Sequence, residues 1–184
     1  NRIVRTAHST GTIGDQLIAY HEARALGGIW LAIVEIACVT PQSATSVPVF
    51  SDQVLPFYEE LSSRMHAHGA KVFQQLWHGG STYARNAAVR PIAPSPIPNV
   101  KVGITPIAMT KGMIDDTVAA FASAARRVET GGLDGIELHA AHGYLIGSFL
   151  SPATNQREDE YGGSTENRAR FVREILAAIR SEVS

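Results

Sequence analysis

Three side chains that can donate or exchange protons lie within six residues of one another, just past the end of a predicted strand. They are His139, His142 and Tyr144, in the run His-Ala-Ala-His-Gly-Tyr. Two histidines three positions apart on a turn can converge on one oxygen atom. Hydrogen bonds from both to a carbonyl make its conjugated β-carbon more electrophilic, and a neighbouring tyrosine can protonate the adjacent carbon. The pattern therefore predicts a site that activates an unsaturated carbonyl compound.

Two other interpretations of these residues stay open. A His-x-x-His pair could bind a metal, although the recognisable zinc motif is His-Glu-x-x-His, with its histidines one helical turn apart. The histidines could also be structural, and Tyr144 taken alone would more often pack than react. Because Tyr144 lies beside both histidines, the chemical interpretation is favoured, and no metal is expected.

The elements that position these residues follow from the hydrophobic pattern. Short apolar runs predict strands at residues 3–4, 29–34, 71–77 and 133–138. Helical periodicity predicts helices over residues 16–26 and 54–65, and a third from Asp115 or Asp116 to residue 128. A fourth helix should follow Ser164 as its N-cap and bury Phe171, Ile175 and Ile179. Residues 90–106 and 139–163 are predicted to be irregular loops.

Strands that alternate with helices are typical of parallel βαβ units, in either a doubly wound sheet or a barrel. No Gly-x-Gly-x-x-Gly motif follows the first strand, which disfavours a dinucleotide-binding fold. Polar residues follow each strand, at 8–9, 35–36, 75–80 and 139–144, as at the catalytic mouth of a barrel. A complete barrel needs about 250 residues. We therefore predict an α/β fold, a partial (β/α)8 TIM barrel of roughly the first four βα units.

Composition limits the class of protein. Hydrophobic residues make up 45% of the 184 residues and charged residues 18%, which is typical of a globular domain. The net charge of −1 gives no reason to expect nucleic acid or an anionic membrane as a partner. Cys38 is the single cysteine. With no apolar run of about 18 residues and no signal-peptide pattern, we expect a cytoplasmic protein. The chain lacks an initial methionine and stops soon after a helix pattern, so residues 1–184 are expected to be the N-terminal half of one barrel domain, truncated at both ends.

The chain resembles the old yellow enzyme family. The resemblance is carried by residues 132–145, 149–152, 154–157, 159, 161–164 and 166–168, and upstream by residues 1–4 and 75–80. It spans essentially the whole chain. It implies an enzyme that holds FMN at the mouth of a barrel and passes hydride from NADH or NADPH, through the flavin, to an activated C=C bond.

The resemblance also implies roles for individual residues. His139 and His142 match the pair that binds the carbonyl oxygen of the substrate, and Tyr144 matches the proton donor. Gln75 matches the glutamine that pairs with the pyrimidine edge of the flavin, to which an amide offers both a donor and an acceptor. Trp77 matches a residue that lines the substrate pocket, although a tryptophan at a strand end is more often part of the core.

Further flavin contacts are implied after the first two strands. Ala7, His8 and Ser9 would face the flavin, with Ser9 near N5 and O4, where relatives carry threonine or cysteine. An ordinary loop serine is the alternative. Ile36 would contribute only its main chain, and its bulk departs from the small residue usual there. In having a histidine at position 8, the chain resembles longer relatives that oxidise amines or reduce dienoyl thioesters.

Two segments depart from the usual pattern of the family, and a third group of residues that could look catalytic is expected to be structural. Residues 78–81 read His-Gly-Gly-Ser where the family commonly has His-Ala-Gly-Arg, and residues 5–8 depart from Met-x-Pro-Met. Arg157, Asp159 and Arg168 are expected to form a structural clasp over the barrel rather than to take part in catalysis.

Three functions remain open at this stage. The first is an FMN-dependent oxidoreductase that reduces the C=C bond of an α,β-unsaturated carbonyl compound. The second is a multidomain dienoyl-CoA reductase or amine dehydrogenase-like flavoenzyme, with a 4Fe-4S cluster and FAD in a C-terminal part. The third is an inactive half-barrel fragment. The expected partner is a small unsaturated carbonyl substrate, with self-association left open. Because flavin phosphate contacts usually come from strands seven and eight, residues 1–184 alone are expected to bind FMN weakly.

Overall fold

The computed structural model describes residues 2–43, 47–82, 90–100 and 102–184. Its main sheet is parallel and contains β1 (Val4–Arg5), β2 (Leu31–Cys38), β3 (Lys71–Trp77) and β6 (Gly135–Leu138), in the spatial order β1-β2-β3-β6. The spatial order repeats the chain order, so every crossover proceeds in the same direction around the sheet. Right-handed crossovers of that kind place all helices on one face, as in a barrel, whereas a doubly wound sheet reverses its order.

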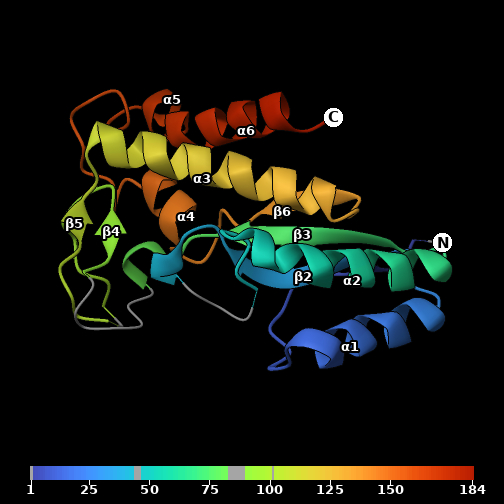
Figure 1. Cartoon of the computed structure of the whole chain (residues 1–184). Helices are drawn as coiled ribbons and strands as arrows, with labels where there is room; N and C mark the ends of the chain where they lie inside the picture. The colour runs from blue at the N-terminus through green and yellow to red at the C-terminus, as the bar shows by residue number, and fades with distance from the viewer. Residues whose placement is uncertain (1, 44–46, 83–89, 101) are drawn as a thin grey trace.

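The four long helices cover this outer face. They are α1 (Gly14–Leu26), α2 (Leu55–Ala67), α3 (Lys111–Thr130) and α6 (Arg170–Glu182). Figure 1 shows α1 beside α2 and α3 beside α6. The core lies between strands and helices and includes Ala32, Val34, Val72 and Leu76 from the sheet with Leu17, Tyr58, Leu61, Phe121 and Ile175 from the helices.

Side-chain alternation along β3 separates the two faces of the sheet. The Tyr58 hydroxyl of α2 donates to Oε1 of the buried Gln74 at 3.1 Å, so Gln74 faces the helices. Successive residues of a strand point to opposite faces, which places Gln75 and Trp77 on the inner face. Gln75 is paired in register with Glu137 of β6. The inner face of this sheet therefore carries polar side chains at its carboxyl end.

Shorter elements gather at that end. A small parallel sheet is formed by β4 (Ile92–Ala93) and β5 (Ile107–Ala108), and α4 (Leu145–Leu150) packs next to it. Figure 1 shows these elements at the end of the molecule opposite both termini. The remaining elements are α5 (Thr165–Arg168) and the 3-10 turns η1 (Pro41–Ser43), η2 (Asp52–Val54) and η3 (Gly80–Thr82).

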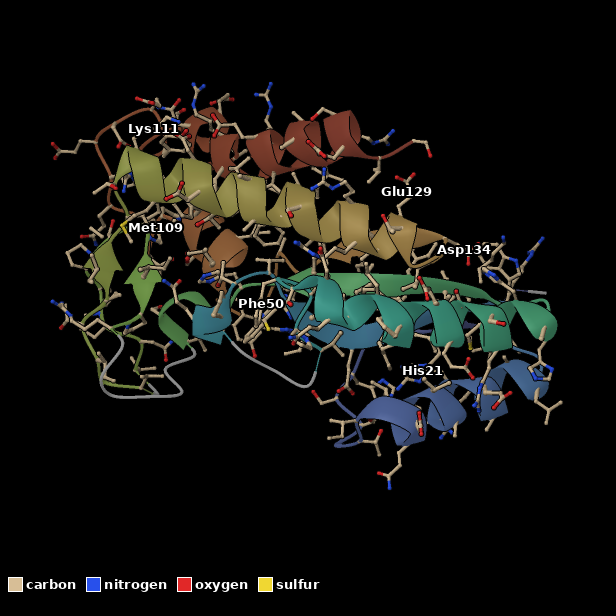
Figure 2. All side chains as sticks on the ribbon, in the orientation of Figure 1. His21, Phe50, Met109, Lys111, Glu129 and Asp134 are labelled. Carbon is tan, nitrogen blue, oxygen red and sulfur yellow. The ribbon has the colours of Figure 1, made fainter. Side chains whose placement is uncertain are left out.

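At the opposite end of the sheet, the carboxylate of Asp134 forms a clamp that joins α2, β3 and β6. Asp134, just before β6, accepts from Lys71 Nζ at 2.7 Å, from His66 Nε2 at 2.8 Å and from the Val72 amide at 2.9 Å. Figure 2 shows Asp134 far from Met109, which lies beside β5. The clamp holds the end of α2 against the starts of β3 and β6, at the face of a barrel that serves stability.

The structure confirms the strand at 71–77 and the Ser164 cap, whose hydroxyl accepts from the Asn167 amide at 3.2 Å. The helix predicted after Ser164 is divided at Ala169, so Ser164 caps the short α5, and Phe171, Ile175 and Ile179 are buried on α6. The predicted start of the third helix was wrong: α3 begins at Lys111, and the Thr110 hydroxyl accepts from the Met113 amide. Ile114 in the first turn is buried on the same face as Phe121, so Asp115 and Asp116 lie inside the helix and do not cap it.

Two other predicted segments also differ. β2 extends to Cys38, so residues 35–36 lie inside the strand rather than after it. The predicted loops at 90–106 and 139–163 contain β4 and α4, which are too short to produce a periodic pattern. Asn1, part of the first matching run, lies outside the described residues. Among helices in the described ranges, none is both long and apolar enough to cross a bilayer.

Candidate active site

The two histidines at the end of β6 form a directly bonded pair. His139 Nδ1 accepts from the Ala141 amide at 3.3 Å, so the neutral ring carries its proton on Nε2. His139 Nε2 lies 3.2 Å from His142 Nδ1. Because Nε2 is the donor, His142 Nδ1 is the acceptor. Within the described ranges, no group of three His, Cys, Asp or Glu side chains is placed to hold a metal.

Burial of His139 affects its protonation. Desolvation, followed by the nearby His142, lowers the pKa of His139, and the Glu137 carboxylate partly opposes this shift. The ring is therefore neutral near pH 7 and can donate a hydrogen bond to a substrate oxygen without adding a charge.

The backbone at His142 is held in a left-handed conformation. His142 has φ of 58°, and among described non-glycine residues it is the one with positive φ. The turn is fixed by the Tyr144 amide, which donates to Ala141 O at 3.2 Å, and by the Thr82 hydroxyl, which donates to Gly143 O at 2.9 Å. Non-glycine residues in this region are strained, and such strain is common at functional sites.

Tyr144 packs edge-on against its neighbours. Its ring centroid lies 4.8 Å from that of His139 and 5.1 Å from that of Trp77, with interplanar angles of 85° in both cases. Its hydroxyl makes no hydrogen bond with the described part of the chain. Trp77 is fully buried beneath it and positions the phenol ring. A direct role of Trp77 in lining a substrate pocket stays a prediction.

Gln75 lies deeper on the same inner face. Its Nε2 donates to Glu137 Oε2 at 2.6 Å. His139 directly follows β6, two positions after Glu137, and its amide donates to Leu76 O at 3.0 Å. Strand alternation therefore places its side chain on the same face as Gln75 and Glu137. The structure thus brings Gln75 to the neighbourhood of His139, His142 and Tyr144.

The implied flavin contacts after β1 lie on a loop beside β2. His8 and Ser9 are exposed and Ala7 is half-buried. His8 is engaged locally, with Nδ1 3.0 Å from Thr6 O and Nε2 3.1 Å from Arg5. Thr10 anchors the loop because its amide and hydroxyl donate to Glu35 Oε2 at 2.6 and 2.9 Å.

Glu35 and Ile36 lie at an irregularity of β2, where the register with β3 shifts between Val34 and Ala37. Bulges of this kind redirect a strand and are common near active sites. A role of Ile36 through its main chain stays a prediction.

Comparison with known proteins decides the family. The family model described as NADH:flavin oxidoreductase / NADH oxidase matches residues 2–184. The chain belongs to this family.

Curated relatives in the family are longer than this chain. The NADH oxidase of Thermoanaerobacter brockii is 40% identical over 195 aligned residues, which cover 100% of this chain and 30% of the relative. The NADPH dehydrogenase of Clostridium acetobutylicum is 39% identical over 98% of this chain and 56% of the relative. The chain thus spans between about a third and just over half of the length of these relatives.

Solved structures agree with the family assignment. A 2-naphthoyl-CoA reductase in complex with 2-naphthoyl-CoA matches with a TM-score of 0.92 and 30% identity, over 100% of this chain and 32% of that one. The old yellow enzyme of Pichia sp. AKU4542 matches with a TM-score of 0.86 and 27% identity, over 100% of this chain and 53% of that one. The predicted partial TIM barrel and the resemblance to old yellow enzymes are confirmed.

The residues present fit one edge of the FMN that this family's name implies. The Gln75 amide offers a fixed acceptor and a second N–H on the inner face, which suits the pyrimidine edge of a flavin. The loop at residues 7–9, in which His8 and Ser9 are exposed and Ala7 is half-buried, and the irregular strand at Ile36 would border the ring.

The loop after β3 supports the histidine turn from behind. The amide of Leu145, at the start of α4, donates to His78 O at 3.1 Å, and the Gly80 amide donates to His78 Nδ1 at 3.1 Å. Burial lowers the pKa of His78 to about 4, so this ring stays neutral. Gly80 has φ of 56°, and a Cβ there would lie 3.0 Å from Leu145 Cα. Gly80, the glycine that this segment shares with the usual motif, therefore permits this close approach.

The predicted structural clasp is confirmed. Arg157 donates to Pro94 O at 3.0 Å and Met109 O at 2.6 Å, and forms an ion pair with Asp159 at 2.5 Å. Arg168 donates to Leu150 O at 2.9 Å. These bonds tie the loop after α4 to the β4–β5 sheet.

Two supporting residues escaped the sequence analysis. Glu137 could have been found, because strand alternation places it on the same face as His139. Thr82 gave no signal, since its contact with Gly143 depends on the path of the loop that follows β3.

Proposed function

We propose that this chain forms part of an FMN-dependent oxidoreductase that uses NADH or NADPH to reduce the activated C=C bond of an α,β-unsaturated carbonyl compound. The observation that carries the proposal is the pair of imidazole nitrogens 3.2 Å apart, with the Tyr144 ring against His139. Two hydrogen-bond donors for one oxygen, with a phenol beside them, suit polarisation of a carbonyl group and delivery of a proton to the adjacent carbon.

The chain would hold FMN through Gln75, the backbone of Ala7 and Ile36, and the side chains of His8 and Ser9, with the flavin also packing near His139. Bound FMN would supply a two-electron carrier between the nicotinamide and the alkene. The exposed Ser9 hydroxyl would donate to the flavin ring and stabilise negative charge there. Residues 1–184 would contribute the first four βα units of a single FMN-binding barrel.

The histidine pair would bind the carbonyl oxygen of the substrate. His139 donates from Nε2, because its Nδ1 is occupied by the Ala141 amide. In the free pair His142 Nδ1 accepts the His139 proton. A substrate oxygen could accept from both nitrogens only if the two rings moved apart to admit it and His142 carried a proton on Nδ1. Substrate binding would therefore change the tautomer of His142.

Tyr144 would complete the reduction. As hydride reaches the β-carbon, the phenol would deliver its proton to the neighbouring carbon and recover a proton from solvent. Trp77 and His139 hold the ring edge-on on two sides, so the hydroxyl would be presented in one orientation. Trp77 would also border the substrate pocket.

A second candidate keeps FMN but adds further cofactors. The 30% and 32% coverage of the NADH oxidase and of the 2-naphthoyl-CoA reductase favours a long multidomain enzyme with an iron–sulfur cluster and FAD, acting on a dienoyl-CoA or an amine. His8, held by Arg5 and the Thr6 carbonyl, is the residue of this chain that favours it.

The test uses the full-length protein that contains these residues. It would be purified and assayed for FMN, FAD, iron and sulfide, and then for NADH- and NADPH-dependent reduction of an enone, a dienoyl-CoA and an amine acceptor couple. One FMN per chain, no iron and enone reduction support the first proposal. Iron and FAD with dienoyl-CoA or amine turnover support the second, and absence of any flavin refutes both.

A further inference from the structure

The short contact between Gln75 and Glu137 joins neighbouring strands inside the sheet. Gln75 Nε2 donates to Glu137 Oε2 at 2.6 Å, and the two residues are in register on β3 and β6. Both side chains are half-buried on the inner face. The Glu137 carboxylate therefore lies on the face of the sheet that would border the bound flavin ring.

A glutamine amide can take either of two orientations, and this contact selects one of them. Its oxygen accepts and its nitrogen donates, and a rotation of 180° exchanges the two ends. An ionised carboxylate only accepts, so the Gln75 nitrogen must face Glu137. The Gln75 oxygen is then turned away from Glu137 and toward the rest of the inner face.

We propose that Glu137 is a positioning residue that fixes the orientation of the Gln75 amide, so that its carbonyl oxygen meets the N–H donor of the flavin pyrimidine edge. The inference rests on the proposed function, since it names FMN as the ligand. Glu137 acts through Gln75.

Other features of Glu137 support this role over a purely structural one. No Lys or Arg in the described ranges forms an ion pair with it, whereas Asp134 at the start of the same strand is clamped by Lys71. A half-buried carboxylate whose partner is a neutral amide costs desolvation without an ion pair to offset it. Its charge also reaches the proposed active site, because it opposes the lowering of the His139 pKa.

The experiment is a double-mutant cycle on FMN affinity in the full-length protein. Glu137→Gln keeps the shape but can donate as well as accept, so both orientations of Gln75 become available. We expect FMN to bind about fivefold more weakly, since a charge-assisted bond is replaced by a neutral one. In a Gln75→Leu background the same substitution should change the Kd less than about twofold, because the group that it orients is gone. The control is Glu158→Gln, the same chemical change at an exposed position, which should leave the Kd unaltered.

A second measurement needs no variant. In the nitrogen-15 spectrum of the wild-type apoprotein, one Gln75 side-chain amide proton should be shifted downfield and protected from exchange. Equal effects of Glu137→Gln in both backgrounds, or two solvent-like amide protons on Gln75, would overturn the inference and leave the proposed function standing. A wild-type protein that takes up no FMN would overturn both.

Discussion

Replacing His142 by glycine and, separately, by alanine tests whether its backbone is held in the strained conformation. Both variants remove the imidazole and its bond to His139, so their difference reports the backbone alone. At an ordinary helical or extended position alanine is the more stable of the two, because glycine loses more freedom on folding. At φ of 58° the order should reverse.

The difference in free energy of unfolding between the glycine and alanine variants is set by two opposing effects. A side chain in the left-handed region costs about 1–2 kcal/mol, which glycine avoids. The extra freedom of glycine in the unfolded chain costs roughly 0.5–1 kcal/mol. The glycine variant should therefore be more stable than the alanine variant by about 0.5–1 kcal/mol.

The assay is urea-induced unfolding of both variants under identical conditions. Ala141, the exposed preceding residue, lies outside the left-handed region. Ala141→Gly is therefore the control, and it should lower the free energy of unfolding by roughly 0.5–1 kcal/mol. If alanine at position 142 proved as stable as glycine or more stable, the strained turn would be refuted.

Two further predictions concern stability. Asp134→Asn should lower the free energy of unfolding by about 1 kcal/mol, through loss of the ion pair with Lys71. Partial burial opposes ionisation of Asp134, but its hydrogen bonds, that from Lys71 foremost, hold its pKa below the usual value. The contribution of Asp134 is therefore complete above the unfolded pKa of about 3.9 and lost as the pH falls through the lower folded value. If the free energy of unfolding of the wild type and that of Asp134→Asn fell equally as the pH was lowered, this prediction would be contradicted. Gly162→Ala should lose about 1–3 kcal/mol, because the added Cβ would lie 2.0 Å from Arg157 O. In the same denaturation series Gly112→Ala, where the nearest atom lies at 3.9 Å, should be neutral or stabilising.

The sequence predicted the parallel sheet because long apolar strands and amphipathic helices have strong periods. The strand at 71–77 matched β3, and Ser164 caps a helix as predicted. Elements that depend on tertiary contacts were missed. The β4 and β5 strands have two residues each, and their pairing is supported by Arg157, which is remote in sequence from both.

The site was predictable in its residues but not in its geometry. The spacing of His139, His142 and Tyr144 gave their common location, since six consecutive residues at a strand end cannot separate far. The His139 tautomer could not be predicted, because it depends on the Ala141 amide within a turn of unusual backbone. Nor could the Gln75 orientation be derived, since it depends on the register between β3 and β6.

In the proposed reaction, Tyr144 donates a proton to the substrate during reduction of the alkene. The most direct test is anaerobic stopped-flow spectroscopy of the full-length protein, wild type and Tyr144→Phe, with the two half-reactions measured separately. Reduction of the flavin by NADH or NADPH should be unchanged, whereas its reoxidation by an enone should slow about 10²- to 10⁴-fold. Equal reoxidation rates in the two proteins would contradict the assignment of Tyr144.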